Sequence, residues 1–137
     1  MSQKTILIVD DDPDVRLGLH VRLKANHYNV IFAPDGMASI AEARKHVPDL
    51  IILDLGLPAG DGFSVMERLK ANDSLSLIPV IVLSARDREA NMDRALKAGA
   101  KAFLQKPVDN TQLLSVIRKV LGEKDHTPAV VHDLGDV

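Results

Sequence analysis

The sequence predicts a doubly wound α/β domain, in which helices cover both faces of a parallel sheet. Apolar runs of strand length alternate with amphipathic helical stretches along the 137 residues. The runs are rich in Val, Ile and Leu, whereas aromatic residues make up only 3% of the chain, as suits strands that are buried on both faces. Each helical stretch is long enough to return the chain parallel to the preceding strand.

The first half of the chain supplies three of the expected strands. Residues 5–9 form a β-branched run that ends in acids. Asp12 and Pro13 then open a helix, as N-cap and first helical residue. The apolar stripe of this helix consists of Val15, Leu19 and Leu23. The other elements expected here are a strand at 28–33, a helix from Asp35 and Gly36 through 46, and a strand at 49–53.

The second half begins with a loop rich in Gly and Pro at 56–62, and a helix follows from about residue 63. The remaining elements are a strand at 79–83, a helix at 86–98, a strand at 102–105 and a helix at 109–121. Gly122 ends the last helix, and beyond it the pattern dissolves. We expect one folded domain over residues 1–122, followed by a flexible tail or linker stump at 123–137.

Composition excludes several classes of protein. Without cysteine there is no disulfide framework and no thiolate zinc site. Neither a signal peptide nor an apolar run long enough for a membrane span is present, so we expect a cytoplasmic chain without membrane contact. The net charge is −2 and no basic stripe is visible, which argues against direct nucleic-acid binding. The histidines share no metal-binding spacing and are expected at the surface: His20, His27, His46, His126 and His132.

Polar residues that can bind ligands or take part in a reaction directly follow the expected strands. Asp10 and Asp11 close the first strand, Asp54 the third and Ser84 the fourth, and Lys106 follows the fifth. In an open parallel sheet these strand ends lie along one edge, where ligands bind. If the first and third strands are neighbours, three carboxylates converge beside one hydroxyl and one ammonium group.

Such a cluster requires a cation. Two carboxylates about 4 Å apart repel by roughly 4 kcal/mol at an effective dielectric constant near 20. Oxygen ligands favour Mg²⁺ or Mn²⁺, and Mg²⁺ in proteins commonly combines one or two carboxylates with phosphate oxygens. Lys106 and Ser84 would then bind the oxygens of a transferring phosphoryl group. Asp54 is the expected nucleophile, forming an aspartyl phosphate.

These motifs together resemble the receiver domains of two-component response regulators, in particular single-domain chemotaxis regulators. The resemblance covers about residues 3–122. It is carried by Ile8-Val9-Asp10-Asp11, Leu53-Asp54, Leu57-Pro58, Asp61-Gly62, Val82-Leu83-Ser84-Ala85 and Lys106-Pro107. It implies a flavodoxin-like strand order of 2-1-3-4-5. It also implies a cis Lys106-Pro107 peptide bond.

The resemblance further implies a role for each site residue. Asp54 would accept a phosphoryl group from a sensor histidine kinase or phosphotransfer protein. Asp11 and Asp54 would bind Mg²⁺ directly and Asp10 through water, with the backbone carbonyl of Gly56 completing the protein ligands. The phosphoryl oxygens would be held by Ser84 and Lys106.

A switch is implied as well. The phosphoryl oxygens would draw Ser84 inward, and Phe103 would turn toward the interior in its place. The surface formed by the last two helices and the strand between them would change, and with it the control of a partner or of a missing output domain. Dimerisation through this surface on phosphorylation is a family expectation. Gly56 leaves the phosphoacceptor open to water and small phosphodonors, while Arg86 would partly cover it.

Other interpretations remain. Asp10 and Asp11 alone would suit a strand end, and Asp12 is assigned to helix capping and not to metal. A Mg²⁺-dependent phosphatase of the haloacid-dehalogenase kind needs a second acid two residues after its nucleophile, where Gly56 stands. A receiver fold that only docks, without phosphorylation, is opposed by the intact carboxylates, Ser84 and Lys106. The expected function is therefore a signalling phosphoacceptor and not a metabolic enzyme.

Overall fold

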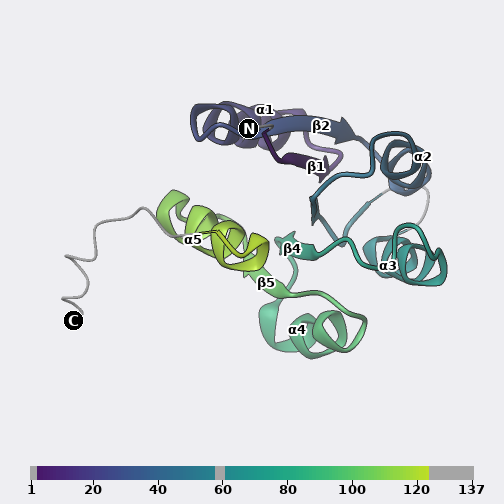
Figure 1. Ribbon diagram of the computed structural model, residues 1–137. Helices are drawn as coiled ribbons and strands as arrows, with labels where there is room; N and C mark the ends of the chain where they lie inside the picture. The colour runs from purple at the N-terminus through teal and green to yellow at the C-terminus, as the bar shows by residue number, and fades with distance from the viewer. Residues whose placement is uncertain (1–2, 58–60, 124–137) are drawn as a thin grey trace.

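The computed structural model describes residues 3–57 and 61–123, in which five strands alternate with five helices (Figure 1). In chain order these are β1 (Thr5–Val9), α1 (Pro13–Ala25), β2 (Asn29–Ala33), α2 (Gly36–His46), β3 (Leu50–Leu53), α3 (Gly62–Ala71), β4 (Val80–Ser84), α4 (Arg88–Lys97), β5 (Ala102–Gln105) and α5 (Asn110–Leu121). Residues 58–60 of the predicted loop, residues 124–137 of the predicted tail at 123–137, and two of the histidines lie outside the described residues. The division at residue 122 stays a prediction.

All five strands are parallel, in the order β2-β1-β3-β4-β5. This confirms the predicted topology. Neighbouring β1 and β3 align Val9 with Leu53, so the residues that follow, Asp10 and Asp54, emerge side by side at one edge. The Asp54 N–H donates to the Val9 carbonyl at 2.9 Å, which extends the pairing of β1 with β3 up to Asp54.

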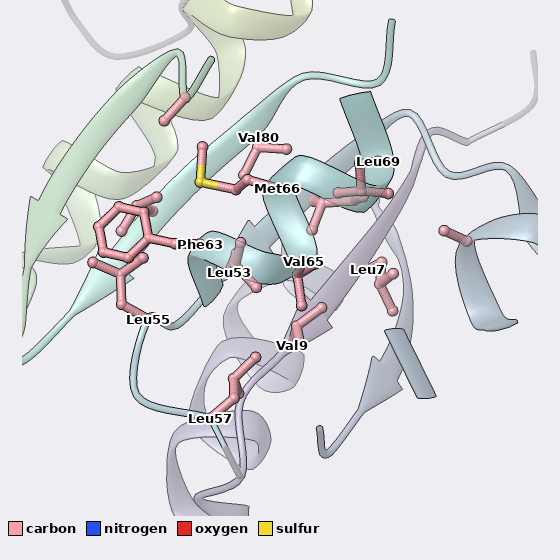
Figure 2. Close-up of a cluster of buried hydrophobic side chains, with 14 of the residues drawn as sticks. Leu7, Val9, Leu53, Leu55, Leu57, Phe63, Val65, Met66, Leu69 and Val80 are labelled. Carbon is pink, nitrogen blue, oxygen red and sulfur yellow. The ribbon is translucent and has the colours of Figure 1, made fainter. Parts of the chain in front are cut away.

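Apolar side chains fill both faces of the sheet. Alternate strand residues such as Leu7 and Val9 point to the face covered by α2, α3 and α4, and they share one buried cluster with Phe63 and Met66 of α3 (Figure 2). The opposite face, under α1 and α5, has its own cluster: Ile6, Ile8, Leu19, Leu23, Leu113 and Ile117 among others. All four residues of β3 are buried, as predicted for a strand with helices on both sides. The strand ends are thereby held on a rigid frame.

Every described helix has an aspartate N-cap whose carboxylate accepts a backbone N–H from the first turn. The five are Asp12, Asp35, Asp61, Asp87 and Asp109. The capping assignment of Asp12 is confirmed. The fourth helix, predicted from Arg86, begins at Arg88 because Asp87 caps it, and β4 runs one residue further than predicted, to Ser84.

One histidine departs from the predicted surface position. His20 is half-buried, its ring lies 5.4 Å from that of Phe32, and its Nδ1 atom is buried without a hydrogen-bond partner. The helix pattern did not reveal this contact because Phe32 comes from a different element, β2. His27 and His46 are exposed as expected. Within the described residues, no helix combines the length and apolar character that crossing a bilayer requires.

Candidate functional site

Three carboxylates meet at the carboxyl edge of the sheet. Asp10, Asp11 and Asp54 each offer an oxygen, and these atoms all lie within 4.8 Å of one another. Asp10 and Asp54 are only 3% and 9% exposed, whereas Asp11 is exposed. The cluster is therefore reached from the side of Asp11. A set of carboxylate oxygens at this spacing fits a hard divalent cation such as Mg²⁺.

Lys106 places its ammonium group against the two buried carboxylates. Its Nζ lies 2.7 Å from Asp10 Oδ2 and 3.6 Å from Asp54 Oδ2. Burial acts to lower the pKa of Lys106, but its hydrogen bond to and attraction by Asp10, and then Asp54, outweigh burial and leave the pKa raised. The side chain is thus a fixed positive charge, and its nearer partner is Asp10.

Asp10 is held in place from several directions. Its Oδ1 accepts the Asp12 N–H at 2.9 Å, and its Oδ2 accepts from Lys106. Arg16 Nη1 donates to the backbone carbonyl of Asp10 at 2.7 Å. Because both carboxylate oxygens already have partners, Asp10 is suited to bind a cation through water. No sequence pattern indicated the Arg16 contact, which joins α1 to the turn before it.

Asp54 sits on backbone that is tightly packed. Its Oδ1 accepts the Gly56 N–H at 3.3 Å. Gly62 lies against the same segment: its N–H donates to the Leu55 carbonyl at 3.0 Å, and a Cβ on it would lie 2.7 Å from both the Asp54 carbonyl oxygen and Leu55 Cα. Only glycine fits there without a shift of backbone. The sequence predicted a turn at Asp61 and Gly62 but not this close approach.

Ser84 and Lys106 approach the site from the neighbouring strands. Ser84 is fully buried, and its Oγ accepts the Arg86 N–H at 3.1 Å. The Lys106 N–H donates to the Ser84 carbonyl at 2.9 Å. The Lys106–Pro107 peptide bond is cis, as predicted. Gly56 is exposed, with open space around the position of a Cβ.

Phe103 differs from the position that the predicted switch starts from. Its side chain is 6% exposed and packs in the core cluster under α3 and α4. The predicted inward turn of Phe103 requires a ring that starts at the surface. In this structure the Phe103 ring already lies in the interior. Buried apolar surface accounts for the difference, since the ring has Val82 as its partner in the sheet register and a cluster of aliphatic side chains around it.

Comparison with known proteins agrees with this geometry. Residues 6–118 match the family described as "Response regulator receiver domain". Response regulator PleD of Caulobacter vibrioides is 39% identical over 120 residues, which is 88% of this chain and 26% of PleD. Protein PilH of Pseudomonas aeruginosa is 35% identical over 116 residues, covering 85% of this chain and 96% of PilH. The chain thus spans about a quarter of the first relative and nearly all of the second.

A solved structure with the same fold contains a metal. The receiver domain of the sensor histidine kinase PA1611 from Pseudomonas aeruginosa, described with a magnesium ion coordinated in its active-site cleft, has a TM-score of 0.82 and 26% identity. The match covers 89% of this chain and 100% of that one. The family match extends over most of the residues that form the sheet and its helices. The chain therefore belongs to the receiver-domain family of two-component response regulators.

Proposed function

We propose that this chain is a phosphoacceptor switch in which Asp54 takes a phosphoryl group from a phosphohistidine of a sensor histidine kinase or phosphotransfer protein. A carboxylate oxygen of Asp54 attacks phosphorus, the P–N bond breaks, and the imidazole leaves. The observation that carries the proposal is the approach of the three carboxylates to within 4.8 Å, with Lys106 beside two of them.

The residues around Asp54 divide the work. Asp11, Asp54 and the Gly56 carbonyl would hold Mg²⁺, or Mn²⁺ in its place, and Asp10 would bind it through water. When bound, the ion offsets the negative charge that develops on the phosphoryl oxygens. Lys106 stands 3.6 Å from Asp54 Oδ2 and supplies a positive charge to a second oxygen. The Ser84 hydroxyl donates a hydrogen bond to a third phosphoryl oxygen. Its Oγ accepts the Arg86 N–H, which leaves the hydroxyl hydrogen for this bond.

The output passes to a partner or to an output domain through α4, β5 and α5. Ser84 lies at the end of β4, and Phe103 lies on the adjacent strand β5. A displacement of Ser84 by the phosphoryl group would therefore change the α4-β5-α5 surface through the contact between these two strands. Support comes from the weak attachment of α4, in which Ala95 is the only buried residue. Dimerisation through this surface, action in the cytoplasm, and the absence of metabolic catalysis and of direct nucleic-acid contact belong to the same proposal.

The test uses the full chain, a small phosphodonor such as acetyl phosphate, and intact mass spectrometry. We expect one phosphoryl adduct that requires Mg²⁺ and is lost in Asp54→Ala. Asp73→Ala, which removes an exposed carboxylate elsewhere, serves as the matched control and should keep the adduct. An adduct of full yield in Asp54→Ala would refute the assignment. Steady turnover of a phosphate ester would instead favour a phosphatase.

A further inference from the structure

The backbone pairing of β1 with β2 stops one hydrogen bond short at Asp10. Val9 is aligned with Ala33, and the Asp10 N–H donates to the Ala33 carbonyl at 3.2 Å. In a parallel ladder the Asp10 carbonyl would next accept the N–H of Asp35, two residues beyond Ala33. Asp35 instead caps α2, and among the described residues its N–H makes no bond to Asp10. The Asp10 carbonyl therefore needs another donor, because residue 10 is only 3% exposed.

Arg16 of α1 supplies this donor. Its Nη1 lies 2.7 Å from the Asp10 carbonyl oxygen, and the residue is half-buried. Within residues 3–57 and 61–123, Arg16 forms no ion pair with a carboxylate, so the polar contact of its guanidinium is with the backbone. A hydrogen bond from a charged donor is about twice as strong as one between neutral groups. The arginine side chain thus completes the hydrogen bonding of β1 where the backbone of β2 turns away.

Arg16 also closes the turn that carries the carboxylates. Its backbone N–H donates to the Asp12 carbonyl at 3.1 Å, and the Asp12 N–H donates to Asp10 Oδ1 at 2.9 Å. Asp11 lies between these two residues and is exposed, and its carboxylate has no hydrogen-bond partner within the described part of the chain. The direction of the Asp11 carboxylate therefore follows from the backbone on either side of it, which Arg16 holds at Asp10 and at Asp12.

We propose that Arg16 is a positioning residue for the divalent cation, an inference that rests on the proposed function of the Asp54 site. By holding the turn, Arg16 keeps the Asp11 carboxylate beside that of Asp54. Residues that orient metal ligands in this way commonly contribute about 10–100-fold in metal affinity. A positive charge near the carboxylates acts in the opposite direction, because it repels a cation. Removal of the guanidinium should therefore weaken Mg²⁺ binding if Arg16 positions the ligands, and strengthen it if Arg16 contributes only charge.

A Mg²⁺ titration of the full chain, followed through the amide signals in NMR spectra, tests this sign. We expect Arg16→Met, which keeps an unbranched stem, to bind Mg²⁺ about tenfold more weakly than the unaltered chain. Arg16→Lys keeps the charge and a donor without the fork geometry of arginine, so its affinity should fall between the two. The control is Arg22→Met, which removes an exposed guanidinium from the same helix and should bind Mg²⁺ as tightly as the unaltered chain or slightly more tightly.

A second measurement needs no metal. Hydrogen exchange of the Asp12 amide without Mg²⁺ reports on the turn directly, since this N–H is bonded to Asp10 Oδ1. Its exchange should be faster in Arg16→Met than in the unaltered chain, because the turn opens more often. The Gln112 amide, which donates to Asp109 at the start of α5 at 3.1 Å, should exchange at the same rate in both.

Mg²⁺ binding by Arg16→Met that equals or exceeds that of the unaltered chain would overturn the proposal and leave the proposed function standing. Equal exchange of the Asp12 amide in the two chains would overturn it as well. If Arg16→Met gives the spectrum of an unfolded chain, the comparison passes to Arg16→Lys, for which an affinity equal to that of the unaltered chain would also refute the role of Arg16. Failure of the unaltered chain to bind Mg²⁺ would instead contradict the proposed function, and this inference with it.

Discussion

Replacing Gly62 by alanine would press a methyl group into the backbone that carries Asp54. The new Cβ would lie 2.7 Å from the Asp54 carbonyl oxygen and from Leu55 Cα, whereas non-bonded carbon atoms prefer about 3.5–4.0 Å. Both obstacles are backbone, so the segment itself must move. Overpacking of this kind costs about 1–3 kcal/mol, and the helix gains at most about 0.5–1 kcal/mol from losing a glycine. We expect a net loss of about 1–2 kcal/mol.

The chain provides a matched control in Gly18. It lies inside α1, and a Cβ there would meet nothing within 4 Å. Gly18→Ala should therefore raise the free energy of unfolding by about 0.5–1 kcal/mol. Urea unfolding measures both substitutions, with an unchanged slope as the sign that only stability has changed. Because Gly62 touches the Asp54 backbone, Gly62→Ala should also slow labelling by acetyl phosphate.

The reasoning fails if Gly62→Ala is as stable as the unaltered chain, or if it gains stability as Gly18→Ala does. Either result would mean that the turn before α3 yields without cost. The backbone at residues 54 and 55 would then not be fixed by the close approach of α3.

Three further substitutions test separate parts of the account. Burial, and then the hydrogen bond with Glu123, raises the pKa of Tyr28 from 10.0 to about 12. As the pH rises, the unfolded chain therefore loses the phenol proton before the folded chain does. The free energy of unfolding should fall by up to about 2–3 kcal/mol between those two pH values. Tyr28→Phe should remove the share of this fall that Tyr28 contributes. Phenolate absorbance reports the ionisation directly because the chain has a single tyrosine and no tryptophan. Arg94 Cζ lies 3.8 Å from the centroid of the Phe63 ring, so Arg94→Met should cost about 0.5–1 kcal/mol in urea unfolding, and no loss would show that the contact is without effect. Asp11→Asn relieves the repulsion between Asp11 and the other two carboxylates and should stabilise the metal-free chain by up to about 1 kcal/mol. The same substitution should reduce the stabilisation by added Mg²⁺. Thermal unfolding with and without Mg²⁺ measures both effects, and an unchanged Mg²⁺ effect would contradict the role of Asp11.

Much of the fold follows from patterns that are local in the sequence. The buried strands are recognisable as short aliphatic runs, and the acids that follow them mark where each strand ends. Parallel strands bring those ends to one edge, so the meeting of Asp10, Asp11, Asp54 and Lys106 could be predicted before any distance was known. The strand order came from the resemblance to receiver domains, because spacing alone does not decide which strands are neighbours.

The features that were missed depend on contacts between distant elements. Whether Phe103 lies inside or outside depends on the space left by α3 and α4, which no strand pattern reports. The stacking of His20 on Phe32 joins α1 to β2. The close approach of Gly62 to the Asp54 segment is a property of how α3 enters the sheet. Sequence reasoning gives the residues of the site, and packing decides how firmly each is held.

The most direct test of the central claim is to locate the phosphoryl group. After labelling with acetyl phosphate and Mg²⁺, borohydride reduction converts an acyl phosphate to an alcohol and marks the residue that carried it. Peptide mass spectrometry should find the mark at Asp54 and not at Asp10 or Asp11, because Asp10 is engaged by Lys106 at 2.7 Å and Asp11 is assigned to the cation. A mark on another carboxylate, or no mark despite an intact adduct, would contradict the account.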